Sequence, residues 1–240
     1  MMLFLAMLLL SASVLGAGAA VRLLPGRDVT RWLKPMLAFS GAYLFSVTIL
    51  HLLPETLALA GAGVARVGYW VLAGFFLQML LELASEGIEH GHVHRHPERD
   101  HGYGPVLLLA SLVVHSALEG SILTERATRA GGGFWPVLLG VVLHHIPAAL
   151  ALMSVLLARL TSFRRALAYL AVFAVASPLG MLVGGAVEDG PAYPILAGLV
   201  AGNFLHISTT ILFETTPEHR FNRPKLLAAL VGVALALVVA

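Results

Sequence analysis

Long apolar runs, repeated along the whole chain and separated by short polar breaks, are the feature that most limits its fold. A transmembrane helix needs roughly 20 mainly apolar residues, and eight segments approach that length. Only 12% of the residues are charged, about half of what a soluble domain carries. We therefore predict an all-α integral membrane protein. Its eight expected spans lie near 3–21, 36–53, 68–85, 105–123, 137–157, 166–187, 192–213 and 226–240.

The two ends of the chain and the breaks between the runs bear on its domain organisation. The segment "MMLFLAMLLLSASVLGAGAA" lacks the positive amino-terminal region of a signal peptide, so we interpret it as the first span. A cleaved signal peptide is the alternative. The breaks leave no room for a soluble domain, so residues 1–240 are predicted to form a single transmembrane domain.

The basic residues between the spans indicate an orientation. Basic residues near span ends are retained on the cytoplasmic side. If the N-terminus lies outside, the Lys and Arg residues fall mostly in cytoplasmic loops, and an even number of spans then places both termini outside. The cytoplasmic set would be Arg22, Arg27, Arg31, Lys34, Arg95, Arg99, Arg159, Arg164, Arg165, Arg220, Arg223 and Lys225, and the outer set Arg66, Arg126 and Arg129.

A weak internal repeat is visible in the sequence. The segment "SGAYLFSVTILHLLPE" ends at Glu55, and the similar segment "AGNFLHISTTILFETTPE" ends at Glu218. The first belongs to an outward-running span and the second to an inward-running one. Inverted repeats of this kind are typical of transporters with a site near the midplane, although apolar sequence also produces such likeness by chance.

Two adjacent spans each carry ionisable residues near the centre. His115 and Glu119, in "VVHSALEG", are four residues apart on one face of the fourth span and make half of a divalent-cation site. His144 and His145 lie in the fifth span, at nearly the same depth if the two spans are antiparallel. Because ionisable groups in the bilayer are costly unless paired or hydrated, we predict a midplane metal site. A structural hydrogen-bond network is the alternative.

Pro147 follows the two histidines of the fifth span. It has no backbone N–H to donate to Leu143, and its ring crowds that turn. We therefore expect a kink that opens the helix beside the histidines.

Further polar residues are candidates for admitting or releasing an ion. His51 and Glu55 form a second pair, four residues apart, at the outer end of the second span, and His206 is a single histidine in the seventh. A structural role is an equal alternative for each of them. The pair would then mark an interfacial helix end, and His206 would form a hydrogen bond to a neighbouring helix.

The loop between the third and fourth spans, residues 86–104, is rich in histidine. Alternating histidines with acidic neighbours make a flexible metal-binding tract of low specificity, and the distribution of basic residues places this loop in the cytoplasm. A merely solvated loop is the alternative. The candidate residues for admission or release here are His90, His92, His94 and His96.

Taken in this order, the motifs resemble those of the ZIP family of zinc and iron permeases over nearly the whole chain. They are "HLLPE", "HSALEG", "HHIPAALAL" and "SPLGMLVG" in the second, fourth, fifth and sixth spans. The resemblance implies a central pair, spans four and five, between inverted repeats of spans 1–3 and 6–8. It implies that His115, Glu119 and His144 line the transport site, with Ser116 and His145 at a neighbouring metal position. We expect a prokaryotic member, in the cytoplasmic (inner) membrane if the source is bacterial.

One departure from the family pattern bears on the number of metal ions. Many members carry a glutamate four residues after the first histidine of the fifth span, where this chain has Ala148. A carboxylate that would bridge two metals is thus absent. We therefore expect one metal, bound by His115, Glu119 and His144, with a preference for nitrogen-seeking cations such as Zn²⁺.

These residues predict the transport of a divalent cation, with zinc favoured, toward the cytoplasm. The chain has no cysteine, no phosphate-binding loop and no His-Glu-x-x-His motif, and its basic residues are too scattered for nucleic-acid binding. We expect no organic cofactor and no enzymatic activity, and we expect metal ions and the lipid bilayer as partners. Glycine-rich spans such as "GMLVGG" also permit a homodimer. The alternatives are a membrane-embedded zinc hydrolase and a non-conducting metal sensor.

Overall fold

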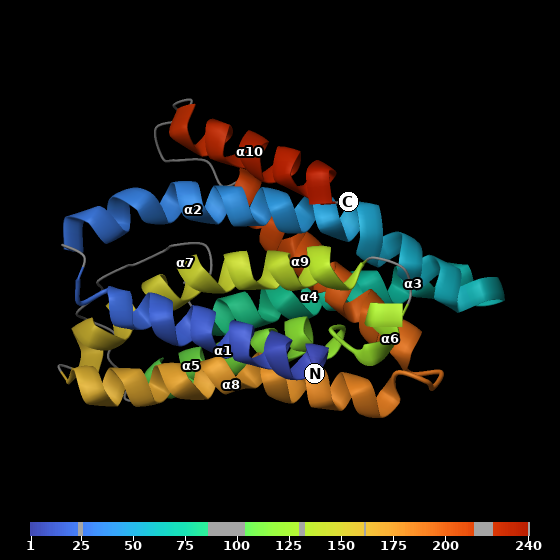
Figure 1. Ribbon diagram of the computed structural model, residues 1–240, viewed down its shortest axis with the longest axis horizontal. Coiled ribbons are helices and arrows are strands. Elements are labelled where there is room, and N and C mark those ends of the chain that lie inside the picture. The colour runs from blue at the N-terminus through green and yellow to red at the C-terminus, as the bar shows by residue number, and fades with distance from the viewer. Residues whose placement is uncertain (24–25, 86–103, 130–132, 161, 214–222, 240) are drawn as a thin grey trace.

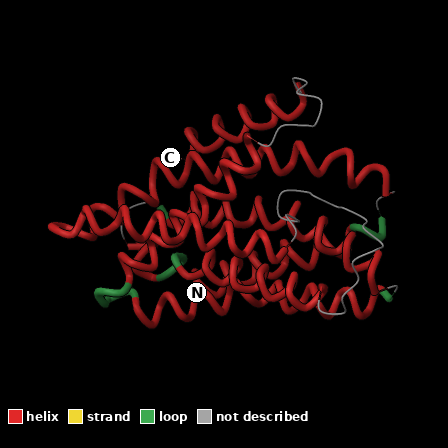
Figure 2. Tube along the Cα trace, turned by 180° about the vertical axis from the view of Figure 1, so that it is seen from behind, coloured by secondary structure: helices red, strands yellow, loops and turns green. Residues whose placement is uncertain are grey.

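The computed structural model describes residues 1–23, 26–85, 104–129, 133–160, 162–213 and 223–239 (Figure 1). This part of the chain is helical and contains no strand, as Figure 2 shows, which confirms the predicted all-α class. The histidine-rich loop predicted at 86–104 lies outside the described residues except for Gly104. The long helices are α1 (Met2–Ala20), α2 (Gly26–Val47), α4 (Val64–Ser85), α5 (Gly104–Ser121), α7 (Phe134–Leu160), α8 (Phe163–Val187), α9 (Tyr193–Phe213) and α10 (Arg223–Val239).

Each apolar run of the sequence coincides with one of these helices. Within the described residues, six stretches are long and apolar enough to cross a membrane. The helices α5 and α10 occupy the two remaining runs and are shorter, with 18 and 17 residues. The six are Met2–Ala20, Arg31–Ala60, Val64–Ser85, Phe134–Leu160, Phe163–Val187 and Tyr193–Phe213.

The second span extends beyond its predicted end at residue 53. Helix α2 continues through a π-helical turn, η1 (Thr48–Leu52), into α3 (Leu53–Ala60). The N–H of Leu53 donates to the carbonyl of Thr48, five residues back. Pro54, at the start of α3, has no N–H to donate to the preceding turn, and the wider π-turn lets the helix continue past it. The segment from His51 to Glu55 therefore lies within a continuous helix and is not the helix end considered as the alternative.

The helices lie side by side along the long axis of a bundle, with α10 and α8 at opposite sides in Figure 1 and α7 and α9 between them. Among the neighbouring pairs, α4 packs against α9, α10 against α2, α5 against α8, and α1 against both α7 and α8. Many side chains of α7 are buried, whereas α4 turns most of its side chains outward. The exposed residues of α4 include Phe76, Leu80 and Leu83, which suits a surface in contact with lipid.

Two glycines allow α4 and α9 to approach closely. A Cβ atom on Gly74 of α4 would collide with the backbone carbonyl of Leu199, and a Cβ on Gly202 of α9 would collide with that of Val71. Small residues at a helix contact permit backbone approach of this kind in membranes. The approach matters because one turn beyond Gly74 the two helices bring polar side chains toward α5.

Two hydrophobic clusters divide the interior along the bundle axis. One contains Phe134, Val137 and Val141 from the first part of α7, and the other contains Ala149, Leu152 and Leu156 from its second part. Leu108 and Leu112 of α5 belong to the second cluster, and Ile122, directly after α5, belongs to the first. The polar residues of α5 and α7 therefore lie between two apolar layers.

Candidate metal site

Three of the predicted ligands meet between α5 and α7. His115, Glu119 and His144 each offer a ligand atom, and these atoms lie within 4.8 Å of one another. Nε2 of His115 lies 3.4 Å from Oε1 of Glu119, and the ring centroids of His115 and His144 are 6.0 Å apart. All three side chains are buried. The common depth expected of the two histidine spans is thus found, while the role of these residues as ligands stays a prediction.

One of the distances between these atoms matches that of a tetrahedral zinc site. Zinc ligands at about 2.0–2.2 Å from the metal lie about 3.4 Å from one another. The distance of 3.4 Å between Nε2 of His115 and Oε1 of Glu119 has this value, and the ligand atom of His144 lies within 4.8 Å of the other two. Imidazole nitrogen and carboxylate oxygen are donors that suit Zn²⁺.

The two residues expected at a neighbouring metal position are also adjacent. Nε2 of His145 lies 3.0 Å from Oε2 of Glu119, the second carboxylate oxygen. The hydroxyl of Ser116 lies 3.5 Å from the same nitrogen and 3.0 Å from the hydroxyl of Ser177 on α8. Ala148 is buried, one turn after His144. In this arrangement His145 contacts Oε2 of Glu119, whereas His115 lies near Oε1.

Helix α7 is uninterrupted from Phe134 to Leu160, with Pro147 inside it. Pro147 therefore does not end the helix, and a kink beside the histidines stays a prediction. The donors of this site therefore come from side chains on two intact helices.

Two buried amides complete the surroundings of His115, and the sequence analysis did not single them out. Oε1 of Gln78 on α4 lies 3.2 Å from Nδ1 of His115, and Nδ2 of Asn203 on α9 donates to the same oxygen at 2.9 Å. Both side chains are fully buried. The available signal was a polar amide inside an otherwise apolar span, which needs a partner from another helix.

The other histidine candidates lie elsewhere. His206 is bound to a neighbouring helix, with Nε2 2.6 Å from Oε2 of Glu82 and the edge of Phe75 against its ring. This is the structural alternative considered for His206. His51 lies in the π-turn, and the carboxylate of Glu55, one turn further, lies against Gly133. A role for any of them in admitting or releasing an ion stays a prediction.

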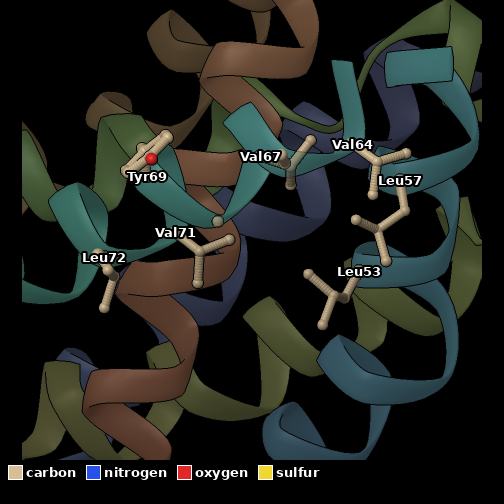
Figure 3. Close-up of a pocket in the computed structure, with 9 residues that line it drawn as sticks. Leu53, Leu57, Val64, Val67, Tyr69, Val71 and Leu72 are labelled. Carbon is tan, nitrogen blue, oxygen red and sulfur yellow. The ribbon is translucent and has the colours of Figure 1, made fainter. Parts of the chain in front are cut away.

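A separate hollow between α3 and α4 is apolar (Figure 3). Leu53 and Leu57 of α3 face Val64 and Val67 of α4 across it, and its volume is about 580 Å³. None of its lining residues is a candidate ligand. Its chemistry suits hydrocarbon rather than an ion.

A bundle of membrane-spanning helices, with imidazoles and a carboxylate buried between two apolar layers, defines an integral membrane protein of the metal-handling class. Residues 90–240 match the family described as ZIP zinc transporter. The chain belongs to this family. ZIP members are metal transporters and not enzymes, so membership does not favour the hydrolase alternative.

A curated plant protein shares part of the sequence. Zinc transporter 1 of Oryza sativa subsp. japonica is 34% identical to this chain over 149 residues, which cover 56% of the chain and 42% of the plant protein. The chain thus matches less than half the length of that relative.

Proposed function

We propose that the protein carries a divalent metal cation, with zinc as the favoured substrate, across the membrane toward the cytoplasm. His115, Glu119 and His144 would replace the water around the ion at mid-depth. The observation that carries the proposal is the buried meeting of these three donors in a member of a zinc transporter family. Buried ionisable groups in a membrane are costly unless paired or hydrated, and a dication held by all three donors would supply a common partner.

The surroundings of the three donors support one ion rather than two. Ala148 brings no carboxylate to the site, and His145 and Ser116 are already in contact with Glu119 and Ser177. A single carboxylate with two imidazoles also balances little of the charge of a dication. A moderate affinity follows from this, and a carrier needs moderate affinity to release its cargo.

The packing of the helices supports eight spans arranged as an inverted repeat around α5 and α7. In such a repeat, α1, α2 and α4 correspond to α8, α9 and α10. The contact of α4 with α9 then corresponds to that of α10 with α2, and the contact of α5 with α8 to that of α7 with α1. All four contacts are present. We therefore include α5 and α10 among the spans, with both termini outside.

The remaining candidates would serve the rest of the route. His51 and Glu55 would admit the ion at the outer end, and His206 would release it at the inner end. The loop residues His90, His92, His94 and His96 would receive it in the cytoplasm. We propose a prokaryotic source and, if it is bacterial, the inner membrane, and the glycine-rich spans are compatible with a homodimer.

Zinc flux into proteoliposomes tests this proposal. The wild type is expected to carry Zn²⁺ down its gradient, and Glu119→Ala is expected to lose nearly all of that flux. The matched control is Glu125→Ala, which removes an exposed carboxylate outside the cluster. Folded Glu119→Ala protein that carries zinc at the wild-type rate would refute the site. Zinc binding by the wild type without flux would favour a sensor, and hydrolysis of lipid or peptide without flux would favour the hydrolase.

A further inference from the structure

Two amide side chains from different helices contact His115 through the ring nitrogen that does not face Glu119. Gln78 comes from α4 and Asn203 from α9, and both are fully buried. They are 125 residues apart in the sequence. They meet because α4 and α9 pack closely at Gly74 and Gly202.

The distances in this group favour a hydrogen on Nδ1 of His115. Nδ2 of Asn203 is a donor only, and it lies 2.9 Å from Oε1 of Gln78 and 3.5 Å from Nδ1 of His115. The shorter contact makes Oε1 of Gln78 the acceptor. Nδ1 of His115, 3.2 Å from that same oxygen, bonds to it only if Nδ1 carries a hydrogen. In a neutral imidazole the other nitrogen, Nε2, then has a free lone pair.

That lone pair points to the place where a cation would bind. Nε2 of His115 and Oε1 of Glu119 are 3.4 Å apart, and with this tautomer both are acceptors with no hydrogen between them. Oε1 of Glu119 has no hydrogen-bond partner among the described residues. A buried pair of facing acceptors is unfavourable by itself, and a metal ion between them satisfies both.

We propose that Gln78 and Asn203 are positioning residues, which hold His115 with its hydrogen on Nδ1 and so present Nε2 to the transported cation. This inference rests on the proposed function, because it concerns the same site. Metal-binding histidines commonly donate their second N–H to an oxygen acceptor, and this contact fixes the tautomer and the ring orientation. Here the acceptor is an amide, and a second amide from another helix holds it in place.

Reversing both amides would have the opposite effect. An N–H of Gln78 would then donate to Nδ1, and the hydrogen of His115 would lie on Nε2 against Glu119. The position of the cation would be filled by that hydrogen. The two arrangements predict different nitrogen spectra, so they can be told apart.

The test combines zinc affinity with the nitrogen NMR signals of His115 in purified full-length protein. The signals are assigned by their loss in His115→Asn. Gln78→Leu removes the acceptor, Gln78→Glu keeps an oxygen in its place, and Asn203→Leu removes the second amide. Ser111→Ala is the matched control, because it removes a buried hydroxyl one turn from His115 that donates within its own helix, to the carbonyl of Leu108.

In the zinc-free wild type we expect a protonated Nδ1. Gln78→Leu should mix the two tautomers and weaken zinc binding about 10- to 100-fold, the usual effect of losing such a partner. Asn203→Leu should have a smaller effect, and the double variant should lose no more than Gln78→Leu alone. Gln78→Glu and Ser111→Ala should stay within a few-fold of the wild type, and the melting temperatures of Ser111→Ala and Gln78→Leu serve to separate affinity from folding.

Two results would overturn the inference: a zinc-free wild type with its hydrogen on Nε2, or a folded Gln78→Leu variant with unchanged affinity and spectrum. If Gln78→Leu does not fold, Gln78→Glu is the deciding variant. It keeps an acceptor oxygen, so a tenfold loss of zinc affinity in Gln78→Glu would contradict an acceptor role for Gln78. Failure of the proposed function is recognised separately. In that case the wild type carries no zinc, or Glu119→Ala carries it normally, whatever the Gln78 variants do.

Discussion

At the scale of single residues, the two adjacent histidines of α7 should differ sharply. His144 belongs to the three-atom cluster, whereas His145 contacts the carboxylate of Glu119 through Nε2. We expect His144→Ala to weaken zinc binding at least about tenfold, which is about 1.4 kcal/mol, because the proposed site would lose a ligand. His145→Asn keeps a donor for Glu119, so the hydrogen bond to this charged group is retained. We therefore expect affinity to change no more than about threefold, or about 0.7 kcal/mol, which is less than the loss of such a bond would cost. Titration with a competing zinc dye measures both, and equal losses would contradict the assignment.

The same residues show what sequence alone can predict about the site. The spacing of His115 and Glu119 follows from the helical period, and the depth of His144 follows from two antiparallel spans with a short connection. The roles of Gln78 and Asn203 could not be predicted this way. Their meeting depends on how α4 packs against α9, and an uncharged amide in an apolar span has no periodic pattern that names its partner.

At the scale of helices, the close contact of α4 with α9 should tolerate no added methyl group. Gly74→Ala places a Cβ against the backbone of Leu199, and overpacking of this kind costs about 1–3 kcal/mol. Gly68→Ala, on the same helix, meets nothing within 4 Å and should not lower stability. Thermal unfolding in detergent compares the two variants. Zinc affinity should fall only in Gly74→Ala, because α4 carries Gln78 one turn further. Equal stability of the two variants would contradict the close packing.

The extent of the helices was largely predictable and their packing was not. Hydropathy locates most of the helices to within a few residues, because lipid forces every apolar run to satisfy its own backbone. The exception is the second span, predicted at 36–53. Its helix begins at Gly26 and continues through a π-turn to Ala60. Which helices touch depends on small residues such as Gly202, and the apolar pattern does not reveal them.

At the scale of the whole molecule, the predicted orientation can be tested by labelling single cysteines. The chain contains no cysteine, so the wild type itself is the unlabelled control. Figure 1 shows α3 and α6 (Glu125–Arg129) at one end of the bundle, while α7 ends and α8 begins at the other. The connection between α8 and α9 belongs to the predicted outer end, and the residues that follow α1 belong to the predicted inner end.

Two exposed positions serve for this test. Asp189 follows α8, and Leu23 follows α1. Because basic residues stay on the cytoplasmic side, Asp189→Cys should react with a membrane-impermeant maleimide in intact cells. Leu23→Cys should react only after the membrane is permeabilised. Both variants should retain zinc flux, since neither residue lies near His115. The reverse labelling pattern would show that the protein has the opposite orientation in the membrane. Labelling of both positions in intact cells would rule out an odd number of spans between them.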